Sequence, residues 1–129
     1  MNKDDFADYL RCMNTKDFDG LAKYYTPDLR LLSGFGPVPM SFEGREAMLE
    51  MERDQARLFD WEWTINQLVL DKDGAAADAS MARRALKDLP DTMFGPMKAG
   101  EEVKMRCFIF YKLRDGKISE IRLSQFTGQ

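Results

Sequence analysis

The chain has 129 residues, a hydrophobic content of 44%, a charged content of 32% and a formal net charge of −3. These values are typical of a soluble globular protein and predict a single domain over residues 1–129. The absence of histidine excludes Ser-His-Asp and Cys-His nucleophile systems and removes the commonest metal ligand. Any catalysis must then use carboxylates, Tyr, Lys, Arg, Cys or bound water, and we expect neither a metal nor a cofactor.

The charge pattern and the hydropathy pattern restrict the possible partners. Lys and Arg do not cluster as a phosphate-binding face would, so nucleic-acid binding is disfavoured. No apolar run approaches the roughly 20 residues needed to cross a bilayer, and the first residues do not form a signal peptide. Cys12 and Cys107 fit neither a disulfide framework nor a metal motif. We expect a cytoplasmic protein that does not contact a membrane.

The first half of the chain is predicted to be mainly helical. Apolar residues at helical spacing indicate one helix over residues 4–14 and a second over 16–25, capped by Thr15. Pro27 is expected to end the second helix, because its ring clashes with a continued helix. A third helix is expected from about residue 44 to residue 59.

The second half of the chain is predicted to form a sheet. A loop with two glycines and two prolines spans residues 34–39, and another loop spans 88–100. The predicted strands cover residues 29–33, 61–70, 75–86, 103–113 and 118–126. Helices segregated from a mostly antiparallel sheet define an α+β domain.

The last two strands are predicted to form a hairpin around Asp115-Gly116, a pair typical of type I′ turns. Counting from this turn places Phe110 opposite Ile121 and Phe108 opposite Leu123 on one apolar face, with Arg106 opposite Gln125 at its end. We expect this face to look inward and to line a pocket. The opposite, outer face is expected to carry Ile109, Tyr111, Glu120 and Arg122 and to form a two-fold interface.

Four short motifs in this order resemble the SnoaL-like branch of the nuclear-transport-factor-two-like superfamily. Residues 14–28 resemble the family's second helix and the turn after it. Gly44-Arg45-Glu46-Ala47 resembles the start of its third helix, residues 94–100 a loop between two sheet strands, and Arg114-Asp115-Gly116-Lys117-Ile118 the final turn. The resemblance implies a cone-shaped, curved, mostly antiparallel sheet, with three helices covering its concave face and enclosing a ligand cavity. It also implies a homodimer through the outer sheet face.

The resemblance leaves the reaction open, because the superfamily contains cyclases, isomerases, dehydratases, epoxide hydrolases and non-catalytic members. Epoxide-hydrolase-like members use an Arg-x-Asp pair and a further Asp, and those positions fall on Ser80, Ala82 and Leu123 here. All three depart from the family's pattern.

We predict that Asp78 is a general base whose pKa is raised by desolvation in the cavity. Arg84, Arg106 and Tyr25 are predicted to orient the substrate. For each of these residues a structural ion pair, an exposed charge or a buried hydroxyl is the competing interpretation. The predicted substrate-binding residues are Ser80, Trp63, Phe108, Phe110, Ile121, Leu123 and Gln125.

Three functional hypotheses remain open. The first is a cofactor-free cyclase, isomerase or dehydratase acting on an apolar polyketide-like or terpenoid-like molecule. The second is a non-catalytic ligand-binding or dimerisation module. The third is a hydrolase or lyase whose carboxylates come from Asp54, Asp60 or Glu62.

Overall fold

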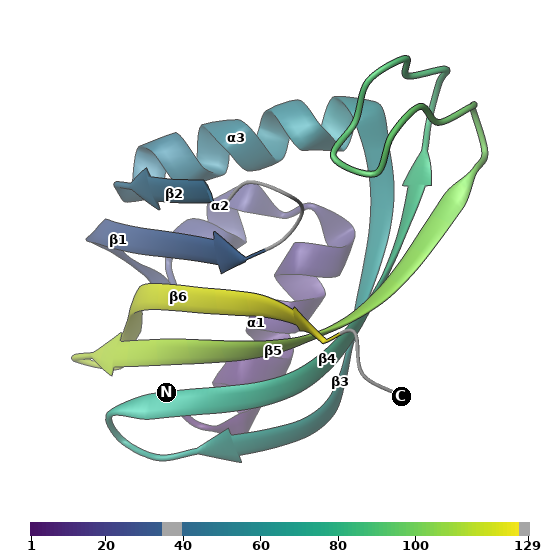
Figure 1. The fold of residues 1–129 in the computed structure, drawn as a ribbon. Coiled ribbons are helices and arrows are strands. Elements are labelled where there is room, and N and C mark those ends of the chain that lie inside the picture. The colour runs from purple at the N-terminus through teal and green to yellow at the C-terminus, as the bar shows by residue number, and fades with distance from the viewer. Residues whose placement is uncertain (35–39, 127–129) are drawn as a thin grey trace.

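A computed structural model describes residues 1–34 and 40–126, so most of the loop predicted over 34–39 lies outside the described residues. The described residues form three helices and six strands (Figure 1). Their bounds are α1 (Lys3–Thr15), α2 (Phe18–Ala22), β1 (Tyr25–Gly34), β2 (Met40–Glu43), α3 (Arg45–Leu58), β3 (Phe59–Leu70), β4 (Gly74–Ala85), β5 (Glu102–Arg114) and β6 (Lys117–Phe126).

The predicted first and third helices are confirmed, whereas the second helix is much shorter than predicted. Asp17, not Thr15, caps α2 by accepting a hydrogen bond from the backbone N–H of Gly20 (3.0 Å). Tyr25 begins β1 and does not end a helix. Pro27 lies inside β1, where the pairing with β6 is irregular between Tyr25 and Arg30, so its missing N–H is tolerated.

The six strands form one sheet in the order β2-β1-β6-β5-β4-β3. The last four strands make the predicted antiparallel meander, and β1 joins it by pairing in parallel with β6. The short strand β2, which extends this edge, was not predicted from the sequence. The predicted α+β class with a curved, mostly antiparallel sheet is confirmed.

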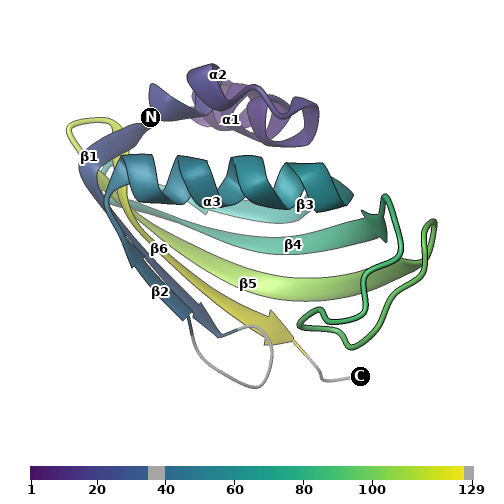
Figure 2. The ribbon, with the colours of Figure 1, turned by 90° about the horizontal axis from the view of Figure 1, so that it is seen from above.

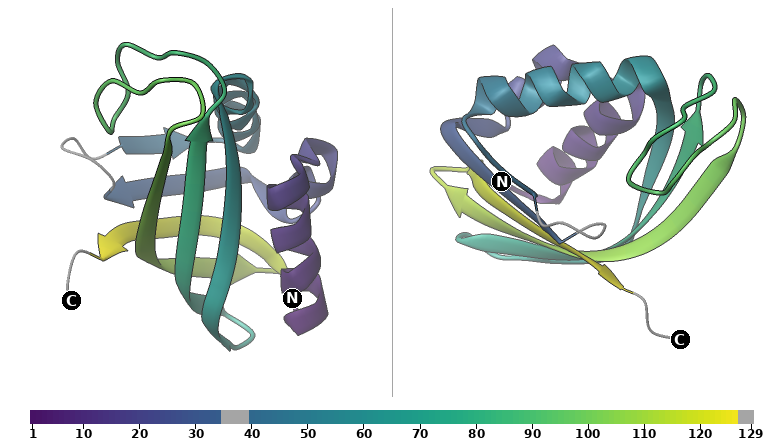
Figure 3. Two further views of the ribbon diagram at one scale, coloured as in Figure 1. Left: turned by 90° about the vertical axis from the view of Figure 1, so that its right-hand side faces the viewer. Right: turned by 45° about the horizontal axis from the view of Figure 1, so that its top comes forward.

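The sheet is strongly curved, and the three helices lie over its concave side (Figures 2 and 3). Ala75, Ala77 and Ala79 of β4 face this side and are buried. Their small side chains leave room for Phe6 and Tyr9 of α1, which belong to the same apolar core. The alanine run is therefore a strand that makes room for large aromatic side chains in the core, despite the low β-propensity of alanine.

The hairpin turn was predicted correctly, but the face that looks inward was not. Cys107, Ile109 and Tyr111 of β5 are buried, whereas Phe108 and Phe110 are 47% and 44% exposed. The expectation that the two phenylalanines look inward is therefore wrong.

The strand register explains part of this error. Arg114 pairs with Lys117 and Leu113 with Ile118, but Lys112 pairs with Glu120, so Ser119 has no partner opposite it. This β-bulge reverses the side-chain alternation beyond the turn. As a result Phe110 lies opposite Arg122 and Phe108 opposite Ser124.

Candidate active site

A cavity of about 330 Å³ lies between the concave face of the sheet and helices α1 and α3. Its volume is at the lower end of the range of about 300–1,000 Å³ that small-molecule sites occupy. Most of its lining is apolar, and it includes both tryptophans of the chain and six of the nine methionines. The lining methionines and tryptophans are Met13, Met40, Met48, Met51, Met81, Met93, Trp61 and Trp63.

Glu52 of α3 is a buried carboxylate in the wall of this cavity. The residue is only 8% exposed, and its Oε2 has no hydrogen-bond partner among the described residues. Burial raises the pKa of the Glu52 carboxyl from its ordinary 4.5 to about 7, and the charge of Arg83 opposes this rise. The carboxyl therefore exchanges a proton near neutral pH, as a general acid–base must.

Arg83 of β4 is the second charged group in the cavity wall. Its guanidinium carbon lies 4.4 Å from the ring centroid of Phe59 and 5.5 Å from that of Trp61. Nη2 donates a hydrogen bond to Oε1 of Gln55 (2.6 Å), whereas Nε is buried without a partner among the described residues. Burial lowers the pKa of Arg83 to about 10, so the group remains a cation at neutral pH.

Three tyrosines gather beside Glu52 at the helix-covered end of the sheet. The hydroxyls of Tyr9 and Tyr25 lie 3.2 Å apart, and the rings of Tyr9 and Tyr111 meet edge to face. Burial raises the pKa of all three hydroxyls, and the nearby charge of Glu52 adds to the rise. They therefore stay protonated and can donate hydrogen bonds.

The polar residues predicted for the site on β4 and β5 lie on the opposite, outer face of the sheet. Arg106 binds Asp78 through Nε (2.9 Å), and this contact lowers the pKa of the Asp78 carboxyl. Ser80 accepts a hydrogen bond from Asn66 (2.9 Å), and Arg84 pairs with Asp60 (3.1 Å). The predicted placement of Asp78, Arg84, Arg106 and Ser80 in the cavity is wrong.

The remaining predicted residues divide between the two faces. Trp63, Ile121 and Leu123 line the cavity as expected, while their role in substrate binding stays a prediction. Tyr25 is fully buried and does not line the cavity, but its hydroxyl lies 3.2 Å from that of Tyr9, which does. Gln125 is exposed near the end of β6.

The carboxylates of the third hypothesis also lie outside the cavity. Asp54 is exposed and pairs with Arg57 on the same helix. Lys16 lies 3.2 Å from Asp60 and lowers the pKa of its carboxyl. Glu62 is exposed on the outer face of β3. A hydrolase built on these three carboxylates is therefore not supported by their positions.

Sequence reasoning missed Glu52 and Arg83, although both are in phase with apolar neighbours. Glu52 follows Met48 by four residues and precedes Gln55 by three, so it lies on the inner stripe of α3. Arg83 continues the alternation of Ala79 and Met81 along β4. A charged residue at a position that the periodicity assigns to a buried face is the sequence signal by which both residues could have been recognised.

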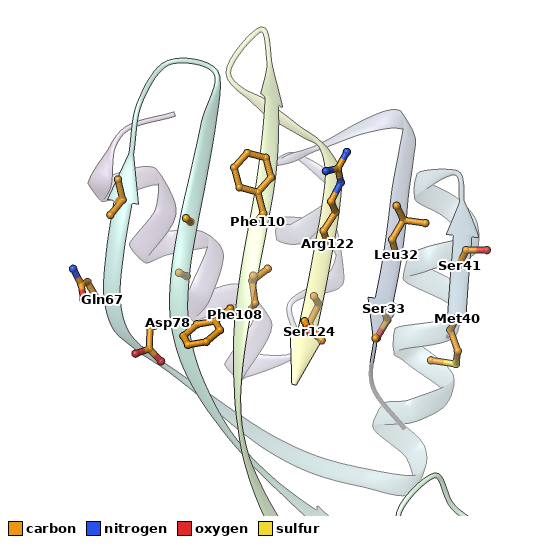
Figure 4. A pocket seen from close by; sticks show the side chains of 16 residues that line it. Leu32, Ser33, Met40, Ser41, Gln67, Asp78, Phe108, Phe110, Arg122 and Ser124 are labelled. Carbon is orange, nitrogen blue, oxygen red and sulfur yellow. The ribbon is translucent and has the colours of Figure 1, made fainter. Parts of the chain in front are cut away.

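The outer face of the sheet carries a second, wider depression of about 810 Å³. Figure 4 shows Phe108 and Phe110 on β5 beside Arg122 and Ser124 on β6, with Asp78 on the β4 side. This depression is open to solvent, and its charged groups are paired: Asp78 with Arg106, and Arg122 with Glu120. None of its described lining residues has a buried polar side-chain atom without a partner, unlike Glu52 and Arg83 of the central cavity.

The chain matches the family model described as a SnoaL-like domain over residues 6–121, which is most of its length. It belongs to the SnoaL-like domain family. The predicted family is thereby confirmed. A search of curated proteins finds no match.

Solved structures show the SnoaL-like fold in several proteins of low sequence identity. A SnoaL-like polyketide cyclase from Agrobacterium tumefaciens is 19% identical, with a TM-score of 0.73 and coverage of 98% of this chain and 94% of that one. An LEH-like epoxide hydrolase from M. tuberculosis is 14% identical, with a TM-score of 0.73 and coverage of 95% and 80%. A protein with a ketosteroid isomerase-like fold from Catenulispora acidiphila, solved with trimethylamine, is 10% identical, with a TM-score of 0.73 and coverage of 95% and 85%.

These similarities establish the fold of this SnoaL-like chain, and the reaction must be argued from its own residues. Within residues 1–34 and 40–126, no helix is both long and apolar enough to cross a membrane.

Proposed function

We propose that this SnoaL-like protein binds an apolar small molecule in the central cavity and catalyses cofactor-free proton transfer on it. The reaction class is isomerisation, cyclisation or dehydration, in which a proton leaves one atom of the substrate and returns at another. The observation that carries this proposal is Glu52, a buried carboxylate with an unpartnered oxygen in the wall of an otherwise apolar cavity. Titratable groups perturbed by burial in a pocket are typical of catalytic sites.

The two charged groups would act in sequence. Ionised Glu52 takes a proton from an acidic C–H or O–H of the substrate, and the negative charge that develops on a substrate oxygen is stabilised by Nε–H of Arg83. Glu52 then returns the proton to a different atom. Because the pKa of Glu52 is about 7, base and acid forms are both populated at neutral pH, which suits both half-steps.

The names of similar structures support this reaction class without deciding it. A polyketide cyclase and an epoxide hydrolase share the fold. Their sequence identity to this chain, 19% and 14%, is too low for their mechanisms to be transferred to it. The second hypothesis, a non-catalytic binding module, uses the same cavity and differs only in the role of Glu52. The experiment must therefore separate binding from proton transfer.

The test is exchange of the α-protons of 2-tetralone in D₂O, followed by proton NMR. This compact ketone fits a small cavity and has acidic C–H bonds. We expect the protein to accelerate exchange above the buffer rate and Glu52→Gln to reduce the acceleration by about 10²–10⁴-fold, the usual contribution of a general base. Glu50→Gln, on the exposed side of the same helix, is the matched control and should exchange normally.

Thermal stabilisation by 2-tetralone measures binding separately, because a ligand that binds the native state raises Tm. Stabilisation without exchange would overturn the catalytic proposal and favour the binding module. If 2-tetralone neither raises Tm nor undergoes faster exchange, that result would contradict the cavity as a site for apolar carbonyl compounds.

We propose in addition that the outer sheet face pairs two copies of the chain. Ile109 and Tyr111, which the sequence predicts for this face, are buried on the inner side, whereas Phe108 and Phe110 form an exposed aromatic ridge. The ridge is part of the lining of the open depression, which has Asp78 on one side and Arg122 on the other. In an isologous contact the ridge of one copy enters the depression of the other, and opposite charges can meet.

A further inference from the structure

The central cavity has two unsatisfied polar atoms of complementary kind in its wall. Oε2 of Glu52 is a hydrogen-bond acceptor, and Nε of Arg83 is a donor; both are buried, and neither has a partner among the described residues. A buried polar group without a partner destabilises the native state. A ligand that offers one donor and one acceptor would therefore satisfy both atoms.

The charge of the cavity restricts the ligand further. Among the described residues of its lining, Glu52 is the one acidic residue and Arg83 the one basic residue, so this lining is electrically neutral when Glu52 is ionised. An anionic ligand would face the Glu52 carboxylate, and a cationic ligand would face Arg83. Because burying a net charge is costly, an uncharged ligand fits best.

The contacts of Arg83 identify the donor that a buried ligand would meet. Its Nη2 donates to Oε1 of Gln55 (2.6 Å), and its guanidinium carbon lies near the rings of Phe59 and Trp61. Nε is its one nitrogen that is buried without a partner among the described residues. This N–H suits a single carbonyl oxygen.

The apolar lining indicates the size and the ring character of the ligand. Methionine thioethers make favourable contacts with ring edges and adapt to irregular shapes, and the rings of Trp61 and Trp63 offer flat surfaces. The volume of about 330 Å³ admits a compact ligand of one or two rings.

Building on the proposed function, we infer that the substrate class is an uncharged, compact aryl or cyclic ketone with a hydroxyl group next to its carbonyl. The carbonyl oxygen accepts from Nε of Arg83, and the hydroxyl donates to Oε2 of Glu52. The same carboxylate oxygen is then positioned beside the acidic C–H and O–H bonds of the hydroxyketone.

The test is a titration of matched ligands followed by tryptophan fluorescence, since the chain's two tryptophans both line the cavity. The probes are 2-hydroxyacetophenone bearing its hydroxyl on the side-chain carbon, acetophenone, phenylglyoxylate and phenacyltrimethylammonium, whose quaternary charge does not depend on pH. Work at about pH 8.5 keeps Glu52 ionised. We expect the hydroxyketone to bind about tenfold or more tightly than acetophenone and than both charged analogues.

Two variants assign the preference to the residues. Glu52→Leu should remove the advantage of the hydroxyl while acetophenone still binds, and Arg83→Met should weaken both ketones. Glu50→Gln should leave all four affinities unchanged. Circular dichroism verifies that each variant is folded.

The outcomes separate the two proposals. If all four probes bind with similar affinity, or a charged analogue binds best, the inferred substrate class is wrong while the cavity remains a binding site. If none of the probes binds, including acetophenone, both the substrate class and the proposed function are contradicted.

Discussion

At the scale of single residues, Glu52 makes native stability depend on pH in an unusual direction. Its pKa is raised in the folded protein, so the folded state binds the proton more tightly than the unfolded state does. The resulting stabilisation is fully present below about pH 4.5 and is lost as pH rises through about 7. Arg83, Tyr9, Tyr25 and Tyr111 all interact electrostatically with this carboxyl.

We predict that Glu52→Gln stabilises the protein at neutral pH. The variant should exceed the wild type in free energy of unfolding by an amount that grows by on the order of 3 kcal/mol between about pH 4 and about pH 8. Urea unfolding of both proteins across this range measures the difference. Glu50→Gln should show no such trend. If the difference in free energy of unfolding between Glu52→Gln and the wild type does not change with pH, the burial of the carboxyl is contradicted.

At the scale of elements, Asn14 joins the end of α1 to β3. Its Nδ2 donates to the carbonyl of Trp63 (2.9 Å), and its Oδ1 accepts from the backbone N–H of Trp63 (2.7 Å). Trp61 adds a bond from its Nε1 to the carbonyl of Met13 (2.9 Å). These contacts hold the helix and the two tryptophans at one end of the cavity.

We predict that Asn14→Ala lowers the free energy of unfolding by about 2–3 kcal/mol, because two hydrogen bonds are lost at once. Asn14→Asp keeps the acceptor and loses the donor, so it should be destabilised less. The control Asn66→Ala removes an exposed amide on the outer face and should cost little. Urea unfolding measures all three, and equal stabilities for Asn14→Ala and Asn66→Ala would contradict the role of this bridge.

The elements themselves were largely predictable, because periodicity and turn residues are local signals. The Asp115-Gly116 turn adopts the expected positive φ angles of 54° and 75°. Helices α1 and α3 begin and end within one residue of the predicted bounds. The strand β2 and the early end of α2 were not predictable in this way, because both depend on pairing between strands. β2 pairs with β1, and Tyr25, shortly after α2, pairs with Ile118 of β6.

The faces of β4 and β5 were predicted in an inverted way, whereas Ile121 and Leu123 of β6 face the cavity as expected. Asp78 does lie opposite Phe108, as an alternating pattern requires, but both side chains point outward. The two phenylalanines of β5 were expected in the core because of their hydrophobicity, but they are exposed. The core face of β4 consists instead of small alanines, which make room for the aromatic side chains of α1. The bulge at Ser119 then separates Phe110 from Ile121, and no local signal marks it.

At the scale of the whole molecule, the exposed ridge of Phe108 and Phe110 is predicted to hold two copies together. The double change Phe108→Ser with Phe110→Ser should shift the protein from dimer to monomer in light scattering after size exclusion. The central cavity is lined from the concave, helix-covered face of the sheet, so 2-tetralone should still raise Tm.

Leu86→Ser is the matched control, because Leu86 is 47% exposed but does not line the outer depression. It should leave the size of the particle unchanged. A wild-type protein that is monomeric at high concentration, or a double variant that remains dimeric, would show that this face does not form the interface.

The position of the ligand within the molecule can be read from its methionine methyl groups by NMR. Six methionines line the central cavity, whereas Met1, Met97 and Met105 do not. Adding 2-tetralone to protein labelled at the methionine methyl carbons should shift the signals of Met13, Met48, Met51, Met81 and Met93 and leave those three unchanged. A shift confined to Met40, which also borders the outer depression, or no shift at all would contradict the central cavity as the site.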